Sequence, residues 1–274
     1  MVLFGGEPTG STWLFRQGRW MRAKPTVSPL PRYGARMAYE PARAVVVLFG
    51  GQAYDRPLHF LADTWTWDGI NWVEIRVMTN PPPRSNHAMA YDAKLDAIIL
   101  VGGLGGPNQH LNDTWKLDNG SWSQVVGLGP GSGFDGGDMA YDAIHQVVIL
   151  LGADPTEKLD TWIFDTKWTK GATGPSGLPA GNMALGPDPL TGTVVMFGGD
   201  RSSGVVGDTW VWDGSTWSRA GSGGAPSPRA RAAMAFDAET SKTILVGGGT
   251  AFPLSGHPSN ETWEWDGRTW RQVA

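Results

Sequence analysis

Few side chains in this chain are suited to act as acids, bases or metal ligands. The chain has 274 residues, with five His and no Cys, which excludes disulfides, thiolate metal sites and Cys nucleophiles. The His residues are isolated, and no HxH or HxxxH spacing occurs that would favour a metal ion. No GxxxxGK phosphate-binding sequence is present. We therefore expect neither a bound metal nor a cofactor.

The remaining chemistry would depend on isolated residues. His87 or Asp138 would act as the acid or base for a small anionic ligand, and Arg36 and Arg231 would hold the anion. No two such groups are close in the sequence, so only the fold could bring them together. The elements that position them decide between an enzyme and a binding protein.

These elements belong to a repeat. The phrase "MAYDAKLDAIILVGG" at Met89 has relatives at Met37, Met139, Met183 and Met234, which gives a period of about 50 residues. Each copy contains an apolar, β-branched run ending in small residues, then a Thr-Trp pair, and then a lone Trp after a turn. Asp-Gly between the last two favours a tight hairpin. Each copy thus predicts four strands, which we name a, b, c and d.

Repeated four-stranded sheets predict a radial arrangement. A single blade cannot cover both of its faces, so neighbouring blades must stack and close a ring. Strand a is rich in Ala, which suits the crowded innermost position. All 15 Trp lie at repeat positions, where they would pack between blades.

The double Gly, the "MAYD" strand and the paired Trp resemble kelch repeats, and "PPRSNHAMAYD" at Pro82–Asp92 fits the bacterial variant best. The resemblance implies an all-β, six-bladed kelch β-propeller with five four-stranded blades and an N-terminal blade of three strands. It also favours, weakly, a bacterial extracellular or cell-surface location. The expected blades of this single domain span about 1–26, 31–78, 83–128, 133–172, 178–222 and 228–274.

The first copy contains strands b, c and d but no strand a. We expect an open edge at Val2–Gly6, which invites a strand from another chain or self-association. A truncated start, or a structural or engineered fragment of a longer kelch protein, explains the same feature.

We expect the functional residues to lie in the connections that differ between copies of the repeat. Connections a–b and c–d leave one face of the ring and are short; the b–c and d–a connections form the other face, here called the loop face, and vary. The b–c connections are Glu7–Gly10, Gln52–Ala62, Leu104–Asn112, Asp154–Leu159, Asp200–Gly207 and Gly249–Asn260. Candidate binding residues on this face are Arg36, His87, Asp138, Asn182 and Arg231 at the entries to strand a, together with Arg201, Tyr54, Phe60, Phe252, His59, His110 and His257.

Some kelch rings bind acidic peptides through residues near these entries. That resemblance implies anion contacts from Arg32, Arg36, Arg84, Arg229 and Arg231, with Arg201 beside them. Arg32, Arg84 and Arg229 directly follow Pro in three units, which favours a scaffold role for these three instead.

The composition argues against two classes of partner, nucleic acids and membrane surfaces. The formal net charge is −4, and no basic field exists for nucleic acid or a membrane surface. We expect a non-catalytic binding module for a protein or glycan. One alternative is a mutarotase-like or lyase-like enzyme whose site lies at the mouth of the ring's central channel, beside the strand-a entries. The other is the structural fragment mentioned above.

Overall fold

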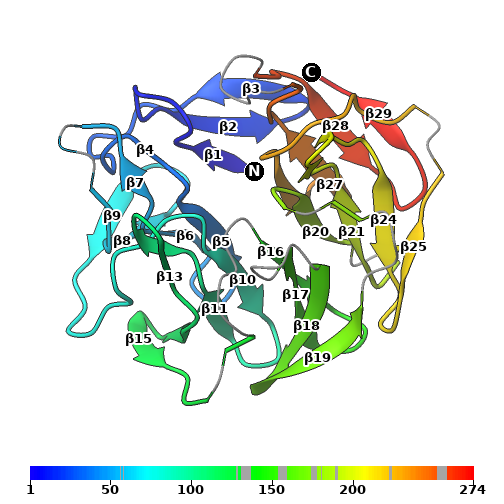
Figure 1. Ribbon diagram of the computed structural model, residues 1–274. Coiled ribbons are helices and arrows are strands. Elements are labelled where there is room, and N and C mark those ends of the chain that lie inside the picture. Colours follow the sequence, from blue (N-terminus) through cyan, green and yellow to red (C-terminus); the bar gives the residue numbers. More distant parts are fainter. Residues whose placement is uncertain are drawn as a thin grey trace. The chain divides into compact units, whose positions relative to one another are not determined.

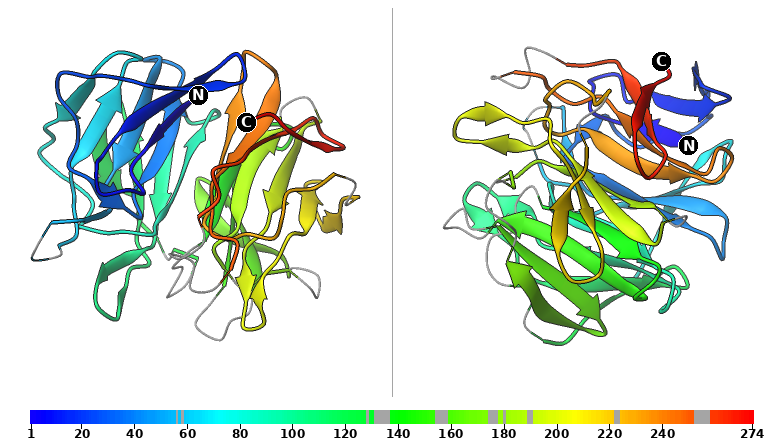
Figure 2. Two further views of the ribbon diagram at one scale, coloured as in Figure 1. Left: turned by 90° about the horizontal axis from the view of Figure 1, so that it is seen from above. Right: turned by 90° about the vertical axis from the view of Figure 1, so that its right-hand side faces the viewer.

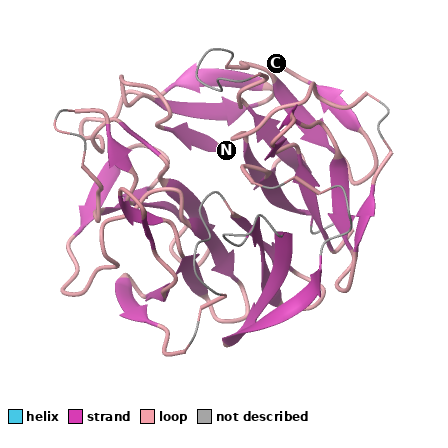
Figure 3. Cartoon of the chain, viewed as in Figure 1, coloured by secondary structure: helices cyan, strands magenta, loops and turns pink. Residues whose placement is uncertain are grey.

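The computed structural model describes residues 1–55, 57, 59–127, 129–130, 137–153, 159–173, 178–179, 181–188, 191–221, 224–251 and 258–274. The chain divides into two compact units, Met1–Asp135 and Gly136–Ala274. In the described residues every regular element is a β-strand (Figure 3). No long apolar helix that could cross a bilayer occurs in this described part.

Unit 1 contains three consecutive antiparallel sheets (Figure 1). The first is β1 (Val2–Phe4), β2 (Thr12–Arg16) and β3 (Arg19–Arg22). The second is β5 (Arg36–Glu40), β6 (Val45–Phe49), β8 (Thr64–Trp67) and β9 (Trp72–Ile75). The third is β10 (Ala88–Asp92), β11 (Ala97–Val101), β14 (Thr114–Asp118) and β15 (Ser121–Gln124). We number these sheets blades 1, 2 and 3.

Unit 2 contains blades 4, 5 and 6, each with four strands in sequence order. Blade 4 is β16 (Asp138–Asp142), β17 (Val147–Ala153), β18 (Leu159–Asp165) and β19 (Lys167–Thr173). Blade 5 is β20 (Ala184–Asp188), β21 (Thr193–Phe197), β24 (Thr209–Trp212) and β25 (Trp217–Arg219). Blade 6 is β26 (Ala233–Asp237), β27 (Lys242–Val246), β28 (Thr262–Trp265) and β29 (Trp270–Gln272).

The predicted fold class is confirmed. Six consecutive up-and-down blades, one with three strands and five with four, are the topology of a six-bladed β-propeller. The strands of each blade are twisted, as can be followed in Figure 2. Two short ribbons lie within b–c connections on the loop face: β12 (Leu104–Gly106) with β13 (Gln109–His110), and β22 (Asp200–Arg201) with β23 (Gly204–Val205). A third, β4 (Arg32–Tyr33) with β7 (Gln52–Ala53), joins the d–a connection before blade 2 to the b–c connection of that blade.

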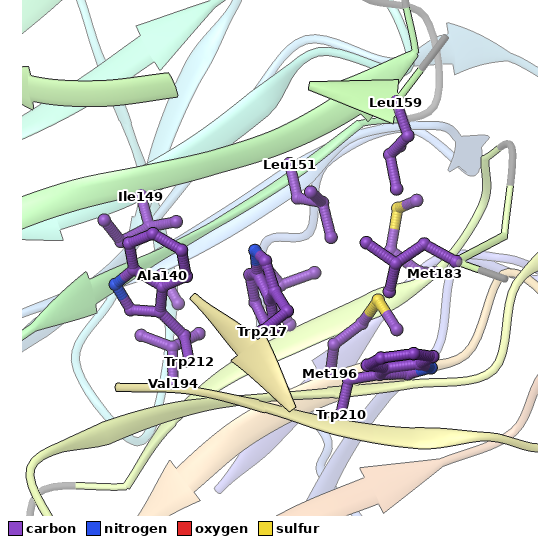
Figure 4. Packing of buried hydrophobic residues seen from close by; sticks show 12 residues of the cluster. Ala140, Ile149, Leu151, Leu159, Met183, Val194, Met196, Trp210, Trp212 and Trp217 are labelled. Atoms are coloured by element: carbon purple, nitrogen blue, oxygen red, sulfur yellow. The ribbon is translucent and has the colours of Figure 1, made fainter. Parts of the chain in front are cut away.

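Neighbouring blades within a unit share an apolar seam. Figure 4 shows Ile149 and Leu151 of blade 4 with Trp212 and Trp217 of blade 5 in one cluster of buried residues. Each Trp that buries its rings here removes roughly 150–250 Å² from water. These recurring tryptophans therefore hold neighbouring blades together, as the sequence predicts.

The double glycines allow a second segment to approach closely. Gly50 has a φ of +61°, and a Cβ there would lie 2.6 Å from the carbonyl oxygen of Arg84. The adjacent Gly51 N–H donates to that carbonyl at 2.8 Å. Only Gly tolerates both conditions, because it has no Cβ.

The sequence alignment places Met183 of blade 5 at the wrong repeat position. In blade 5, Ala184 pairs with Phe197, just as Ala88 pairs with Val101 in blade 3. Leu185 therefore occupies the position of Met89, and Met183 lies before the strand. The a–b connection of blade 5 has the same length as in the other blades, so "LGPD" at Leu185 takes the place of "MAYD" and Met183 is not the equivalent of Met89.

Candidate functional site

The residues predicted at the entries to strand a occupy three different positions. Arg36 and Asp138 are the first residues of β5 and β16, whereas His87 precedes β10 by one residue. Asn182 and Arg231 lie two residues before β20 and β26. The five side chains are therefore not equivalent, and each has its own contacts.

The position two residues before strand a links neighbouring blades. Gly34, Asn86, Asn182 and Arg231 share it, with φ values of +67°, +54°, +54° and +59°. In unit 1 the Asn86 N–H donates to the Gly34 carbonyl at 2.8 Å; in unit 2 the Arg231 N–H donates to Asn182 in the same way, also at 2.8 Å. The backbone at these positions is thus part of the scaffold.

His87 is fully buried, and both ring nitrogens lack a hydrogen-bond partner in the described residues. Its ring contacts Phe49 of the preceding blade edge-on, with centroids 5.6 Å apart. Burial lowers the pKa of His87 well below its usual value, and the charges of Arg84 and Arg36 lower it further. The imidazole is neutral and shielded from solvent, so it is poorly placed to exchange protons with a ligand.

The other two entry residues, Arg36 and Asp138, each contact a neighbouring segment of backbone. Arg36 Nε donates to the His87 backbone carbonyl at 2.9 Å. Asp138 accepts hydrogen bonds from its neighbour Met139 N at 3.0 Å and from Leu185 N of blade 5 at 2.9 Å. Asp138 thus joins two strands of unit 2, which is a structural role.

The Pro-associated arginines are buried scaffold residues, which agrees with the favoured scaffold interpretation and not with the anion contacts that the resemblance implies. Their side chains are fully buried in the described structure: Arg32, Arg84 and Arg229. Each pairs with the acidic residue directly before the Thr-Trp of strand c, here called the strand-c acid, in its own blade: Asp63, Asp113 and Glu261. Each also donates to the first carbonyl of the double Gly: Gly50, Gly102 and Gly247.

The strand-c acid completes a triad with the following Trp. In blade 3, Asp113 accepts from Arg84 at 2.7 and 2.8 Å and from Trp115 Nε1 at 2.6 Å. Burial acts to raise the pKa of Asp113, but the hydrogen bonds from Arg84 and Trp115 hold it below its usual value. The charged arginine is compensated internally and is not free for a ligand.

Blade 5 departs from this triad. Its strand-c acid, Asp208, contacts Arg201 at 3.6 Å and also pairs with Arg219. Trp210 Nε1 is buried and has no hydrogen-bond partner in the described residues. Arg201, a predicted binding residue, is therefore partly engaged in an ion pair.

The remaining predicted loop residues are dispersed. His110 is exposed on β13, and Phe60 forms an isolated bridge with Gln52. His59 is exposed, with Nδ1 3.3 Å from Asp55 Oδ1. Phe252 and His257 lie outside the described residues.

Tyr54 lines a hollow of about 270 Å³ on the loop face of unit 1. The other walls are Pro8, Leu30, Pro31 and Asp55. They come from three connections: b–c of blade 1, d–a between blades 1 and 2, and b–c of blade 2. Apart from Pro31, which belongs to the recurring Pro-Arg pair, the walls come from segments that differ between blades.

Local contacts hold Tyr54 in place. Its N–H donates to the Pro31 carbonyl at 3.1 Å, and its ring meets Tyr33 edge-on with centroids 5.2 Å apart. The Tyr33 hydroxyl in turn donates to Gln52 Oε1. Burial raises the pKa of Tyr54, and nearby Tyr33 and Glu7 raise it further. The neutral ring therefore presents a fixed aromatic wall.

Sequence reasoning named Tyr54 but missed the other walls. Pro8 and Asp55 lie within connections already expected to vary, yet nothing in their spacing shows that they share a hollow. Leu30 is 52 % exposed, and this exposure is visible only in the structure.

The described residues contain no group of three or more His, Cys, Asp or Glu placed to hold a metal ion. Comparison with protein-family models gives no match, and comparison with curated proteins gives no significant match either.

Proposed function

We propose that the chain is a non-catalytic binding module that engages a protein partner through its loop face. The observation that supports this proposal is the hollow at Tyr54. It is built from connections that differ between blades, on a scaffold whose recurring polar groups are occupied with one another. Rigid scaffolds with variable loops are a common basis for recognition.

The enzyme alternative has less support. The residues proposed as acid, base and clamp carry structural contacts: His87 is sealed between blades 2 and 3, and Asp138 binds backbone N–H groups. The kelch-like sequence pattern agrees with a binding role, since such repeats commonly act as recognition domains.

The proposal is tested by selecting peptides that bind the chain and then measuring their affinity for variants of the loop face. Peptides selected from a displayed random library on the immobilised full chain are measured by titration against Tyr54→Ala and Phe60→Ala. The matched control is Tyr39→Ala, which removes an exposed Tyr near the a–b connection of blade 2, away from the loop face. We expect at least a tenfold loss for Tyr54→Ala and little change for the control. Selected peptides that bind all variants equally would contradict the proposal.

Self-association through the edge at Val2–Gly6 stays a prediction. Among the described strands of unit 1, β1 pairs only with β2.

A further inference from the structure

We infer that the hollow at Tyr54 receives one basic side chain, Lys or Arg, from a peptide partner. This inference rests on the proposed binding function and specifies its ligand chemistry. It is carried by the size of the hollow, the nature of its walls and the charge beside it.

The size favours a single side chain. Sites that enclose a whole drug-sized molecule commonly measure about 300–1,000 Å³. The hollow measures about 270 Å³ and is open to solvent on one side. It is thus small for an oligosaccharide or a cofactor, whereas one long side chain can enter while its backbone stays outside.

The walls suit an aliphatic stem. Pro8, Leu30 and Pro31 offer apolar surface without hydrogen-bonding side chains. The Lys and Arg stems bury methylene groups against such surface while the charged head remains near water. Tyr54 adds a ring, and a cation within about 6 Å of such a ring is attracted to its face.

The charge is complementary to a cation. Asp55 lines the hollow, and its side chain is 56 % exposed. Glu7 lies near enough to raise the pKa of Tyr54, and a hydrogen bond from Thr9 lowers the pKa of Glu7 itself, so it is ionised at neutral pH. Arg32, the buried cation that follows Pro31 in the chain, is already paired with Asp63.

Two other side chains bear on these carboxylates. His59 Nδ1 lies 3.3 Å from Asp55, and the charge of Arg22 contributes to the lowered pKa of Glu7. A ligand cation would compete with His59 for Asp55. Because both His59 and Asp55 are exposed, their pairing is worth little and is readily exchanged.

The probe is the peptide acetyl-Gly-Arg-Gly-amide, with citrulline in place of Arg as its neutral isostere. Titration into the ¹⁵N-labelled full chain is followed through the backbone amide resonances of Tyr54 and Asp55. We expect saturable shifts with the Arg peptide and binding at least fivefold weaker with the citrulline peptide.

Variants isolate the charge. Asp55→Asn should reduce Arg-peptide binding to the citrulline level, whereas the matched control Glu74→Gln, an exposed carboxylate on β9, should leave it unchanged. Thermal unfolding of each variant confirms that it is folded.

Three outcomes would overturn the inference: equal binding of the two peptides, no shift at the hollow with either, or shifts produced by maltotriose but not by the Arg peptide. Each leaves the proposed function standing if the selected peptides still depend on Tyr54. Loss of that dependence, by contrast, refutes the proposed function itself.

Discussion

Trp122 Nε1 donates a hydrogen bond to Thr64 Oγ1 at 2.9 Å, joining two buried side chains that are 58 residues apart. The lone Trp of strand d in one blade thereby reaches the Thr-Trp pair of the preceding blade. The same bond of 2.9 Å recurs between Trp72 and Thr12, Trp217 and Thr161, and Trp270 and Thr209. One residue type thus serves both packing and polar pairing at these seams.

Thr64→Val should destabilise the protein more than Thr64→Ser. Val keeps the shape of Thr but removes the acceptor, so the buried Trp122 N–H is left unsatisfied, at a cost of about 1–3 kcal/mol. Ser keeps the hydroxyl and loses only a methyl group. Urea unfolding followed by Trp fluorescence measures both. Equal destabilisation by the two variants would show that the bond contributes nothing.

Arg84→Met should lower the free energy of unfolding by about 3–5 kcal/mol, because it leaves Asp113 without its buried partner. Lys116→Met is the matched control, since Lys116 pairs with Asp118 at 3.3 Å and both side chains are at least one-third exposed. We expect less than about 1 kcal/mol for the control. Chemical denaturation separates the two, and similar losses would argue against a structural role for the buried pair.

Trp115→Phe and Trp210→Phe form a second matched pair. Both Trp are nearly buried, but only Trp115 donates to its strand-c acid; Trp210 Nε1 has no partner in the described residues. Trp115→Phe should therefore cost about 1–2 kcal/mol more than Trp210→Phe. Calorimetric melting of the two variants tests this difference. A larger loss for Trp210→Phe would contradict it.

His87 should make the protein sensitive to acid. Its folded-state pKa lies well below the unfolded value of about 6.5, so the unfolded chain binds the proton more tightly. The resulting loss of stability is absent above about pH 6.5 and grows as the pH falls below it. At pH 5 it reaches up to about 2 kcal/mol.

His87→Met removes this titration, and Met183 occupies the equivalent position in blade 5. Urea unfolding at pH 8 and pH 5 should show a smaller acid-induced loss for His87→Met than for the wild type. Parallel pH dependence of the two proteins would exclude His87 as the cause.

The blade pattern could be predicted from the sequence because it depends on local signals. An apolar run, a Thr-Trp pair and a lone Trp recur in each copy, and Asp-Gly turns and paired glycines recur in several, all consistent with the same strands. The alignment failed at Met183, because Leu185 occupies the repeat position of Met in blade 5 and an unrelated Met stands two residues before it. Strand pairing, which is a non-local property, decided the register there.

The role of the arginines could not be read from composition. Arg32, Arg84 and Arg229 are charged, and charged residues are ordinarily exposed, so a ligand role was a reasonable expectation. Each is instead neutralised by an acid 29 to 32 residues away in the chain. The sequence shows both residues of each ion pair, but not that the fold brings them into contact.

The sequence by itself determined the strands, their order and the number of blades, because these follow from periodicity and turn chemistry within about 50 residues. Only the tertiary structure decided which side chains bond to one another within the scaffold and which remain accessible to a partner. Burial and ion pairing depend on contacts between distant segments, so Tyr54 acquires its hollow from Pro8 and Leu30 only after the blades have packed.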